Sequence, residues 1–296
     1  MRLRWSFRLI AVVTTLHYNA LSASTRQSID DIAVNNLAGT GVKLVAIDLG
    51  GDGEADSVDV NGTAGGDLVT IGKFAGGVSI TGLPAQVTII HADNGAAGDL
   101  LRVFGGEGND TINATAMPDV MNAIYFGENG NDRILGGADV DEFSGGDGSD
   151  RLSGGSNRDF LGGDAGNDFL DGGTGRDVLN GGSGNDVLIG GRNDDKLFCG
   201  DGADRVKYTS ILDGHDVIVD FDGDPAGGQD VLDLDALFDS LGIAASKRAG
   251  LVNINDLGNE VVVSVNADGK AGFELVIATL NTVDDIAKGQ DMVVGT

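Results

Sequence analysis

The stretch GGTGRDVLNGGSGNDVLI (172–189) contains the same nine-residue pattern of glycine, aspartate and leucine twice in a row. The pattern G-G-x-G-x-D-x-U-x, in which U is an apolar residue, also fits residues 105–113 and 145–153 in full. Around these units, aspartate recurs every nine residues from Asp132 to Asp204, and an apolar residue follows each aspartate by two positions. A repeat of this regularity determines the fold of the segment that contains it.

Each nine-residue unit predicts one tight turn and one short strand. Six residues of glycine and short polar side chains favour a turn, because glycine takes positive φ at no steric cost. The next three residues form a very short strand whose middle side chain points inward. Two consecutive units complete one coil, so the U side chains lie between two stacked parallel sheets. Glu128 and Asp164 replace the second glycine of their units, and Cys199 replaces the first glycine of its unit. Weaker turns are expected at these three places.

The repeated aspartates predict a metal site. A core of one apolar residue per nine is thin, and the aspartates of successive coils line up in two columns and repel one another. A hard cation with oxygen ligands resolves both problems, and calcium suits such ligands better than magnesium. Neither histidine nor cysteine stands at the aspartate positions, so zinc and copper are poor fits. The alternative is a glycine-rich acidic solenoid without metal.

The candidate ligands come from turns that lie two units, and therefore one full coil, apart. Nine aspartates in phase give seven such pairs, from Asp132/Asp150 to Asp186/Asp204, and therefore up to seven calcium ions. The expected ligand set is the carboxylates of Asp110, Asp132, Asp141, Asp150, Asp159, Asp168, Asp177, Asp186, Asp195 and Asp204, with turn carbonyls around Gly146, Gly148, Gly155, Gly173, Gly175, Gly182, Gly184 and Gly191.

The flanking segments also have strand patterns. Upstream, alternating branched residues between glycines, as in DSVDV (56–60) and DLVTI (67–71), predict wider coils of a parallel β-helix over residues 30–104. Asp119 follows Asp110 by one repeat, but Asp132 follows Asp119 by one repeat and four further residues, which places a four-residue break in the phase near residues 114–126. The loop Asp48–Asp56 resembles a calcium loop but has Gly50 in place of its middle aspartate, so a surface turn is the favoured interpretation.

Downstream, the nonapeptide period stops after Val206. Residues 215–224 and 229–238 are typical of strands, residues 236–247 predict a short helix, and residues 260–265 and 273–279 predict a hairpin. The predicted fold is therefore all-β. It is a parallel β-helix (30–104) that runs into a parallel β-roll (105–207), capped by a small mostly-β region (208–296).

Charge limits the partners. The 296-residue chain has 46 acidic and 19 basic residues, a net charge of −27, which disfavours nucleic acid and anionic membranes. No segment approaches the length of a membrane span. Residues 1–29 have a basic start and a short apolar stretch, and three interpretations stay open: a Sec signal, a poorly ordered leader, or sequence before the real start site.

The nonapeptides resemble those of the RTX, or hemolysin-type, family of calcium-binding proteins, which Gram-negative bacteria export by type I secretion. The segment 215–296 resembles the family's C-terminal targeting region more weakly, through DVIVDF (216–221) and Asp291-Met-Val-Val. The resemblance implies an extracellular or cell-surface protein that passes the type I secretion machinery unfolded and folds outside, where calcium is abundant. A Sec signal would then be redundant.

Catalytic motifs are missing from the sequence. It contains no H-E-x-x-H and no G-x-S-x-G, and its three histidines are far apart. We expect a non-enzymatic calcium-binding protein with a surface, matrix or interaction role, its partner a polysaccharide or a second copy of itself. The alternatives are a carbohydrate-active β-helix enzyme and a truncated RTX effector whose catalytic domain lies elsewhere.

Overall fold

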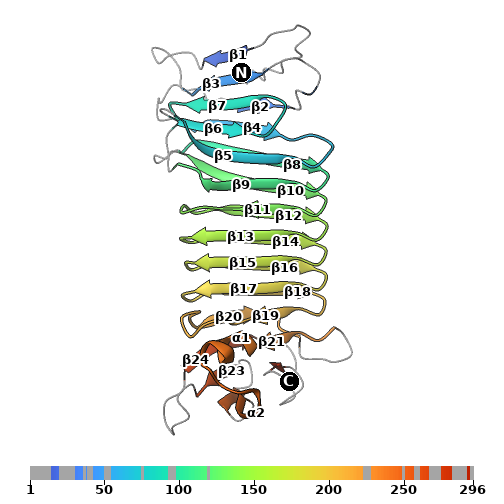
Figure 1. Ribbon diagram of the computed structural model, residues 1–296, viewed down its shortest axis with the longest axis vertical. Helices are drawn as coiled ribbons and strands as arrows, with labels where there is room; N and C mark the ends of the chain where they lie inside the picture. Colours follow the sequence, from blue (N-terminus) through green and yellow to red (C-terminus); the bar gives the residue numbers. More distant parts are fainter. Residues whose placement is uncertain are drawn as a thin grey trace. The chain divides into compact units, whose positions relative to one another are not determined.

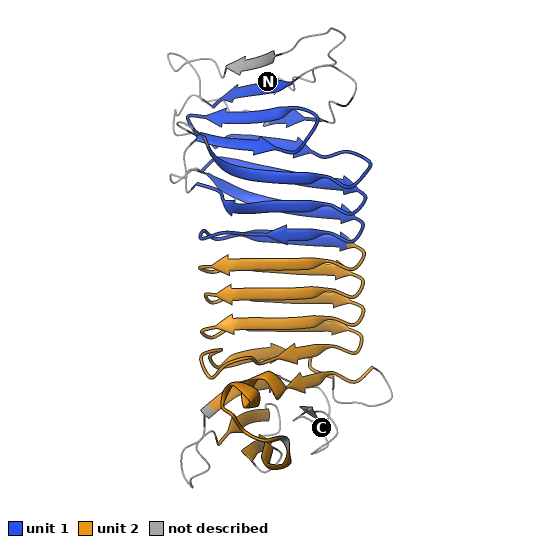
Figure 2. Ribbon diagram, in the orientation of Figure 1, with its two compact units in different colours: residues 1–146 blue, residues 147–296 orange. Residues whose placement is uncertain are grey.

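The computed structural model describes residues 15–19, 31–35, 38, 43–49, 55–74, 77–92, 98–118, 121–222, 228–248, 251–256, 261–266, 275–281 and 292–293. It divides into two compact units, residues 1–146 and 147–296 (Figure 2). In both units the chain winds through two sheets, and most consecutive strands alternate between them (Figure 1). No helix among these residues is long and apolar enough to cross a membrane. The predicted all-β fold with stacked parallel coils is confirmed.

The secondary structure elements described in the first unit are strands. One sheet has the order β1-β3-β7-β6-β5-β9-β11, and the other has the order β2-β4-β8-β10-β12. Their apolar side chains alternate inward, as at Leu101 and Val103 of β8, which are fully buried. The bounds are β1 (Thr15–Asn19), β2 (Asp31–Val34), β3 (Leu44–Asp48), β4 (Ser57–Asn61), β5 (Leu68–Phe74), β6 (Gly77–Thr81), β7 (Gln86–Ile90), β8 (Leu100–Glu107), β9 (Thr111–Ala116), β10 (Asn122–Asn129), β11 (Arg133–Leu135) and β12 (Glu142–Asp147).

One strand of this unit departs from the predicted parallel coils. β6 pairs antiparallel with both β5 and β7, so the expectation of purely parallel winding upstream is wrong here. β5 ends at Phe74 and β6 begins at Gly77, which leaves too short a link for a crossover. A parallel connection needs about a dozen residues or more, whereas a short link makes a hairpin.

The predicted break in the nonapeptide phase is confirmed. β10 pairs with β8 in a register that sets Asn122 beside Leu100, and β11 pairs with β9 with Arg133 beside Thr111. Both registers span 22 residues, which is the ordinary coil of 18 plus the four inserted residues. Asp119, which the sequence placed in this break, lies outside the described residues.

The second unit contains the most regular coils. Its strands pair parallel in registers of one coil, so Leu170 lies beside Leu188 and Leu179 beside Leu197. These leucines are fully buried between the two sheets. The bounds are β13 (Arg151–Ser156), β14 (Phe160–Ala165), β15 (Phe169–Thr174), β16 (Val178–Ser183), β17 (Val187–Arg192), β18 (Lys196–Asp201), β19 (Arg205–Lys207), β20 (Asp216–Val219) and β21 (Val231–Asp233).

The C-terminal part of this unit adds strands and two short helices. β23 (Val261–Val265) lies antiparallel to both β22 (Val252–Asp256) and β24 (Leu275–Asn281), which confirms the hairpin pairing, and β24 lies parallel to β20. A two-residue strand, β25 (Met292–Val293), pairs with β21.

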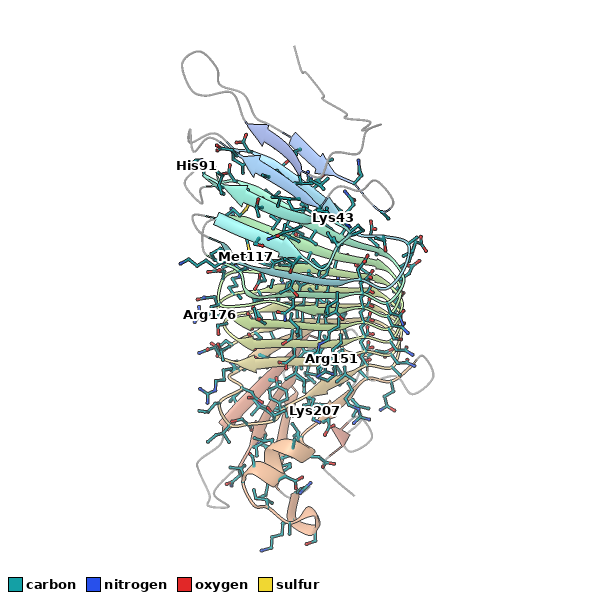
Figure 3. The ribbon with its side chains drawn as sticks, turned by 45° about the horizontal axis from the view of Figure 1, so that its top comes forward. Lys43, His91, Met117, Arg151, Arg176 and Lys207 are labelled. Carbon is teal, nitrogen blue, oxygen red and sulfur yellow. The ribbon has the colours of Figure 1, made fainter. Side chains whose placement is uncertain are left out.

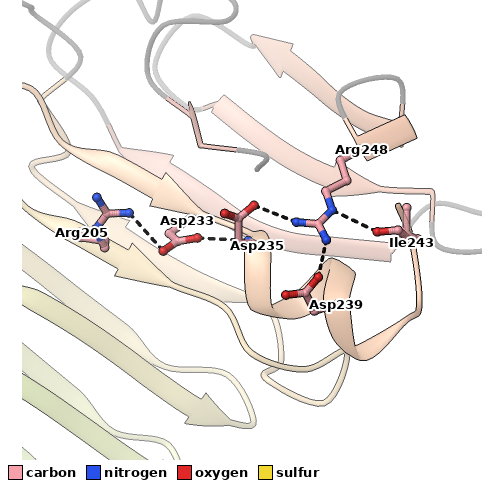
Figure 4. Close-up of polar contacts among 6 residues, drawn as sticks. All are labelled: Arg205, Asp233, Asp235, Asp239, Ile243 and Arg248. Atoms are coloured by element: carbon pink, nitrogen blue, oxygen red, sulfur yellow. Dashed lines mark hydrogen bonds and ion pairs between the residues drawn. The ribbon is translucent and has the colours of Figure 1, made fainter. Parts of the chain in front are cut away.

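The single helix predicted over 236–247 is wrong. The segment forms α1 (Asp235–Ser240) and α2 (Ala245–Arg248), because Gly242 takes a left-handed conformation (φ +67°) that ends α1. The Arg248 guanidinium joins the two helices (Figure 4), since it donates to the carboxylates of Asp235 and Asp239 on α1 and to the Ile243 carbonyl.

Candidate metal centre

The aspartates of the second unit form two hydrogen-bonded ladders. In each step, the backbone N–H of one aspartate donates to Oδ1 of the aspartate 18 residues later, at 2.7–2.8 Å. These bonds hold each carboxylate directly before the strand that carries the buried apolar residue, which is a leucine except after Asp204, where it is Val206. The predicted pairs in this unit are confirmed as neighbours: Asp150/Asp168, Asp159/Asp177, Asp168/Asp186, Asp177/Asp195 and Asp186/Asp204. The other two predicted pairs each take one aspartate from each unit.

In most units the second carboxylate oxygen faces a space that a glycine leaves open. At Gly163, an added Cβ would lie 2.5 Å from Oδ2 of Asp168 and 2.5 Å from the carbonyl oxygen of Gly181 in the next coil. The first unit has the same arrangement at Gly105, where Asp110 Oδ2 would lie 2.6 Å from the added Cβ. The same two kinds of oxygen lie beside Gly154, Gly172 and Gly181, so oxygen atoms from two successive coils converge at these glycines.

Several of these oxygens lack a hydrogen-bond donor. Oδ2 is buried and accepts no hydrogen bond in Asp110, Asp168, Asp177, Asp186, Asp195 and Asp204. A buried carboxylate oxygen in this state is costly unless a cation or a proton compensates it.

Burial raises the pKa values of the ladder carboxyls. Burial is the largest cause throughout, and neighbouring aspartates of the same column raise the pKa of Asp168 further, to about 7. The pKa values of Asp195 and Asp204 also rise to about 7, those of Asp110 and Asp177 to about 6, and that of Asp186 rises as well. The fold thus holds carboxyls where ionisation is unfavourable without a positive charge.

Several of the predicted turn carbonyls line up in columns, each facing a glycine one coil later. The carbonyl oxygens of Gly155, Gly173 and Gly182 lie 2.0–2.3 Å from where a Cβ would stand on the glycine one coil later, and those of Gly148 and Gly184 lie at 1.5 and 1.7 Å. Gly146 and Gly191 are second glycines of their units, and their backbones are left-handed, with φ of +107° and +101°. A Cβ on Gly175 would meet the carbonyl oxygen of Asn157 at 1.7 Å.

The sequence did not predict the carbonyls that share the open side of a glycine with Oδ2. These belong to the first glycine of each unit, as at Gly172, Gly181 and Gly190, whose oxygens lie 2.5–2.7 Å from the Cβ position of the glycine one coil earlier. A signal for these carbonyls was available in the sequence. Glycine recurs at the first position of the unit although the backbone there does not need positive φ, which indicates that a side chain would not fit.

The ladders continue beyond the nonapeptides. Asp195 N–H donates to Oδ1 of Asp216, and Asp204 N–H donates to Oδ1 of Asp230, each at 2.9 Å. The two columns therefore do not end at Asp195 and Asp204, the last two of the nine aspartates in phase. Burial raises the pKa of Asp216 to about 8 and also raises that of Asp230.

The same continuation occurs upstream, in the first unit. Asp67 N–H donates to Asp110 Oδ1 at 2.5 Å, Asp110 N–H to Asp132 Oδ1 at 2.7 Å, and Asp56 N–H to Asp99 Oδ1 at 2.9 Å. In these extensions an apolar residue follows the aspartate by two positions, which predicts a strand but not the strand with which it pairs.

Two predicted features differ from the regular ladder. Asp141, whose pKa burial raises to about 6, uses Oδ2 to accept the Gly137 N–H at 2.8 Å. In the loop Asp48–Asp56, residues 50–54 lie outside the described part of the chain, and Asp48 Oδ1 lies 2.6 Å from Nδ1 of His91.

The donor set fits calcium. Each step offers a buried carboxylate oxygen and backbone carbonyls, which are the ligands that calcium takes at about 2.3–2.6 Å. At Gly163 the carboxylate and carbonyl oxygens are at most about 5 Å apart, a span that one such ion can bridge. Stacked coils with these buried carboxylate columns define a metal-binding β-roll.

Comparison with known families agrees with this assignment. The family model of the RTX calcium-binding nonapeptide repeat matches in four copies, at residues 102–120, 126–161, 162–197 and 171–206. The segment 102–206 is therefore an array of RTX calcium-binding repeats, as the sequence predicted. No curated protein matches the chain.

Proposed function

We propose that this chain is a secreted calcium-binding protein whose coils fold when calcium binds outside the cell, and that its role is non-catalytic. The observation that carries the proposal is the pair of buried aspartate columns, where Oδ2 of Asp168, Asp177 and Asp186 is buried without a hydrogen-bond donor. Calcium, when bound, supplies the positive charge that these columns lack.

The aspartates couple folding to calcium. In an unfolded chain at neutral pH they are ionised and solvated, and folding without calcium would bury them one coil apart. The thin leucine core adds too little to offset this cost. Because calcium binds the folded array and not the separated turns, calcium concentration sets the folded population.

This coupling suits export in the unfolded state. At low cytosolic calcium the repulsion keeps the chain open for the type I secretion machinery, and the high calcium outside a Gram-negative-type cell folds it. We assign the export signal to residues 208–296, on the resemblance of the DVIVDF stretch (216–221) to that region of RTX proteins.

The proposed role is at a surface or matrix, with a polysaccharide or another copy of the chain as partner. The outer sheet faces support this, because they carry cations over aromatic rings. Cζ of Arg151 lies 3.9 Å from the centre of the Phe169 ring, and Nζ of Lys196 lies 4.6 Å from the centre of the Phe198 ring. Arg151 lies on the face of the coils, whereas Arg176 extends from their edge (Figure 3).

A calcium titration followed by circular dichroism tests the proposal. Starting from the full chain in a chelator, we expect a cooperative gain of β signal at about 0.1–1 mM calcium, the range of extracellular sites, and a much weaker response to magnesium. Asp177→Asn should raise the calcium midpoint, whereas Asp147→Asn, the same change at the exposed last residue of β12, should not. A chain that is already folded in the chelator and indifferent to calcium contradicts the proposal, and release of sugars from a polysaccharide contradicts the non-catalytic role.

A further inference from the structure

Cys199 occupies an unusual position in the array. It stands at the first position of the unit that contains Asp204, where the preceding unit has Gly190. A Cβ on Gly190 would lie 2.5 Å from Oδ2 of Asp195, so a side chain at this position of a unit faces the buried carboxylate of the same unit. Cys199 has such a side chain, and it is fully buried.

The thiol lies in a cluster with two carboxylates. Sγ of Cys199 and one carboxylate oxygen each of Asp204 and Asp230 lie within 4.8 Å of one another, and all three residues are at most 1% exposed. The three residues come from β18, the turn before β19, and the link before β21. All of them belong to the second unit.

Backbone hydrogen bonds hold the two carboxylates in place. Asp204 Oδ1 accepts the Asp186 N–H at 2.8 Å, and Asp230 accepts the N–H groups of Asp204 and Asp222 at 2.9 and 2.8 Å. Asp204 Oδ2 is buried and accepts no hydrogen bond. The cluster thus holds a thiol and two buried carboxylates in a prearranged geometry, and one of these carboxylates has an oxygen without a hydrogen-bond donor.

We infer that Cys199, Asp204 and Asp230 form a second kind of metal site, which takes a borderline-soft divalent cation of the zinc class. Thiolate sulfur is a poor ligand for calcium, whereas zinc accepts both thiolate and carboxylate ligands. Tetrahedral zinc with bonds of about 2.0–2.3 Å places its ligands about 3.5 Å apart, which small side-chain movements from the observed cluster can reach.

The surrounding charges favour a cation here. Burial raises the pKa of the Cys199 thiol, and the charged groups that raise it further are Asp230, Asp204 and Asp220. The Cys199 carbonyl oxygen lies beside Asp186, 2.5 Å from where a Cβ on Gly181 would stand. One residue thus contributes its backbone to the oxygen ladder and its side chain to the zinc-class site.

The test is metal loading of the full chain in excess calcium. Zinc retained after desalting is quantified, and cadmium, which replaces zinc at thiolate sites, is followed through its thiolate-to-metal charge-transfer absorption. We expect one equivalent of zinc and a cadmium band in the natural chain. Cys199→Gly, which restores the glycine of the other units, should lose the zinc equivalent while its calcium-dependent dichroism persists. Asp230→Asn keeps the thiol and should weaken cadmium binding by at least about tenfold.

Retention of zinc by Cys199→Gly, or unchanged cadmium affinity in Asp230→Asn, would overturn the inference. Cys199→Ser covers the case in which Asp230→Asn does not fold, because it keeps the side-chain volume and should lose zinc as Cys199→Gly does. The inference does not depend on the proposed calcium-driven folding. The dichroism of the same samples separates the two, because a chain that ignores calcium and still retains one zinc per thiol contradicts only the proposed function.

Discussion

Asp168 is the residue whose substitution separates the two roles that an array aspartate plays. Its Oδ1 accepts the Asp150 N–H, and its Oδ2 is buried with no hydrogen-bond donor. In Asp168→Asn, the amide oxygen can keep the backbone hydrogen bond while the negative charge disappears. We expect opposite effects on stability with and without calcium.

The magnitude follows from the pKa of Asp168. Burial, with the charges of Asp186 and Asp150, raises this pKa from 3.8 to about 7. Each pH unit between these values is worth about 1.4 kcal/mol, so above about pH 7 the ionised carboxyl costs the calcium-free fold about 4 kcal/mol. Asp168→Asn removes this cost. With calcium bound, removing one partner of a buried charge pair instead destabilises by roughly 3–5 kcal/mol.

The assay is urea denaturation at about pH 8, followed by circular dichroism, once in chelator and once in millimolar calcium. Where the calcium-free chain is unfolded in buffer alone, the fraction folded replaces the urea midpoint. Asp147→Asn is the matched control, because it removes the same charge from an exposed position of the same array. Equal destabilisation of Asp168→Asn in chelator and in calcium would refute the reasoning, since the aspartate would then act only as a hydrogen-bond acceptor.

Three further predictions follow from the same coils. Gly172→Ala should cost about 1–3 kcal/mol and reduce calcium affinity, because its Cβ would meet the Gly190 carbonyl oxygen at 2.5 Å and Asp177 Oδ2 at 2.7 Å. Gly65→Ala, whose Cβ would meet nothing within 4 Å, is the control. Equal calcium titrations of the two variants would contradict a calcium site beside Gly172. The calcium-free fold should be most stable below about pH 4 and should become less stable as the pH rises to about 7. The reason is that the pKa values of the ladder carboxyls are about 6–7 in the folded chain, above their ordinary value of 3.8. A stability in chelator that rises with pH would contradict this prediction. Leu179→Ala should destabilise the calcium-loaded array by about 2–5 kcal/mol in urea denaturation, since the side chain is fully buried, and a change below about 0.5 kcal/mol would show that the leucines do not form its core.

The regular part of this molecule was predictable because its period repeats the same local rule. Aspartates 18 residues apart must meet once two units make a coil, and Leu170 must then lie beside Leu188. Left-handed turn positions were predictable for the same reason, and Asp164 and Asn157 adopt positive φ where other units have glycine. The array between residues 127 and 207 therefore needed no tertiary information.

Outside the period, local rules did not determine which strands pair. The strand pattern of β6 does not reveal its direction, which depends on how short the link from Phe74 to Gly77 is. Similarly, Asp216 and Asp230 follow their ladder partners by 21 and 26 residues, because loops of irregular length return the chain to the same column.

The sequence by itself determined the coil, its leucine core and the two columns of candidate calcium ligands, because each depends only on a fixed spacing. The tertiary structure alone decided that the ladders continue into the flanks, and that Cys199, Asp204 and Asp230 gather in one buried cluster. The physical reason is that a buried site is made by groups close in space. Spacing in the chain predicts closeness only where the backbone repeats, and the link that brings Asp230 to Cys199 does not repeat.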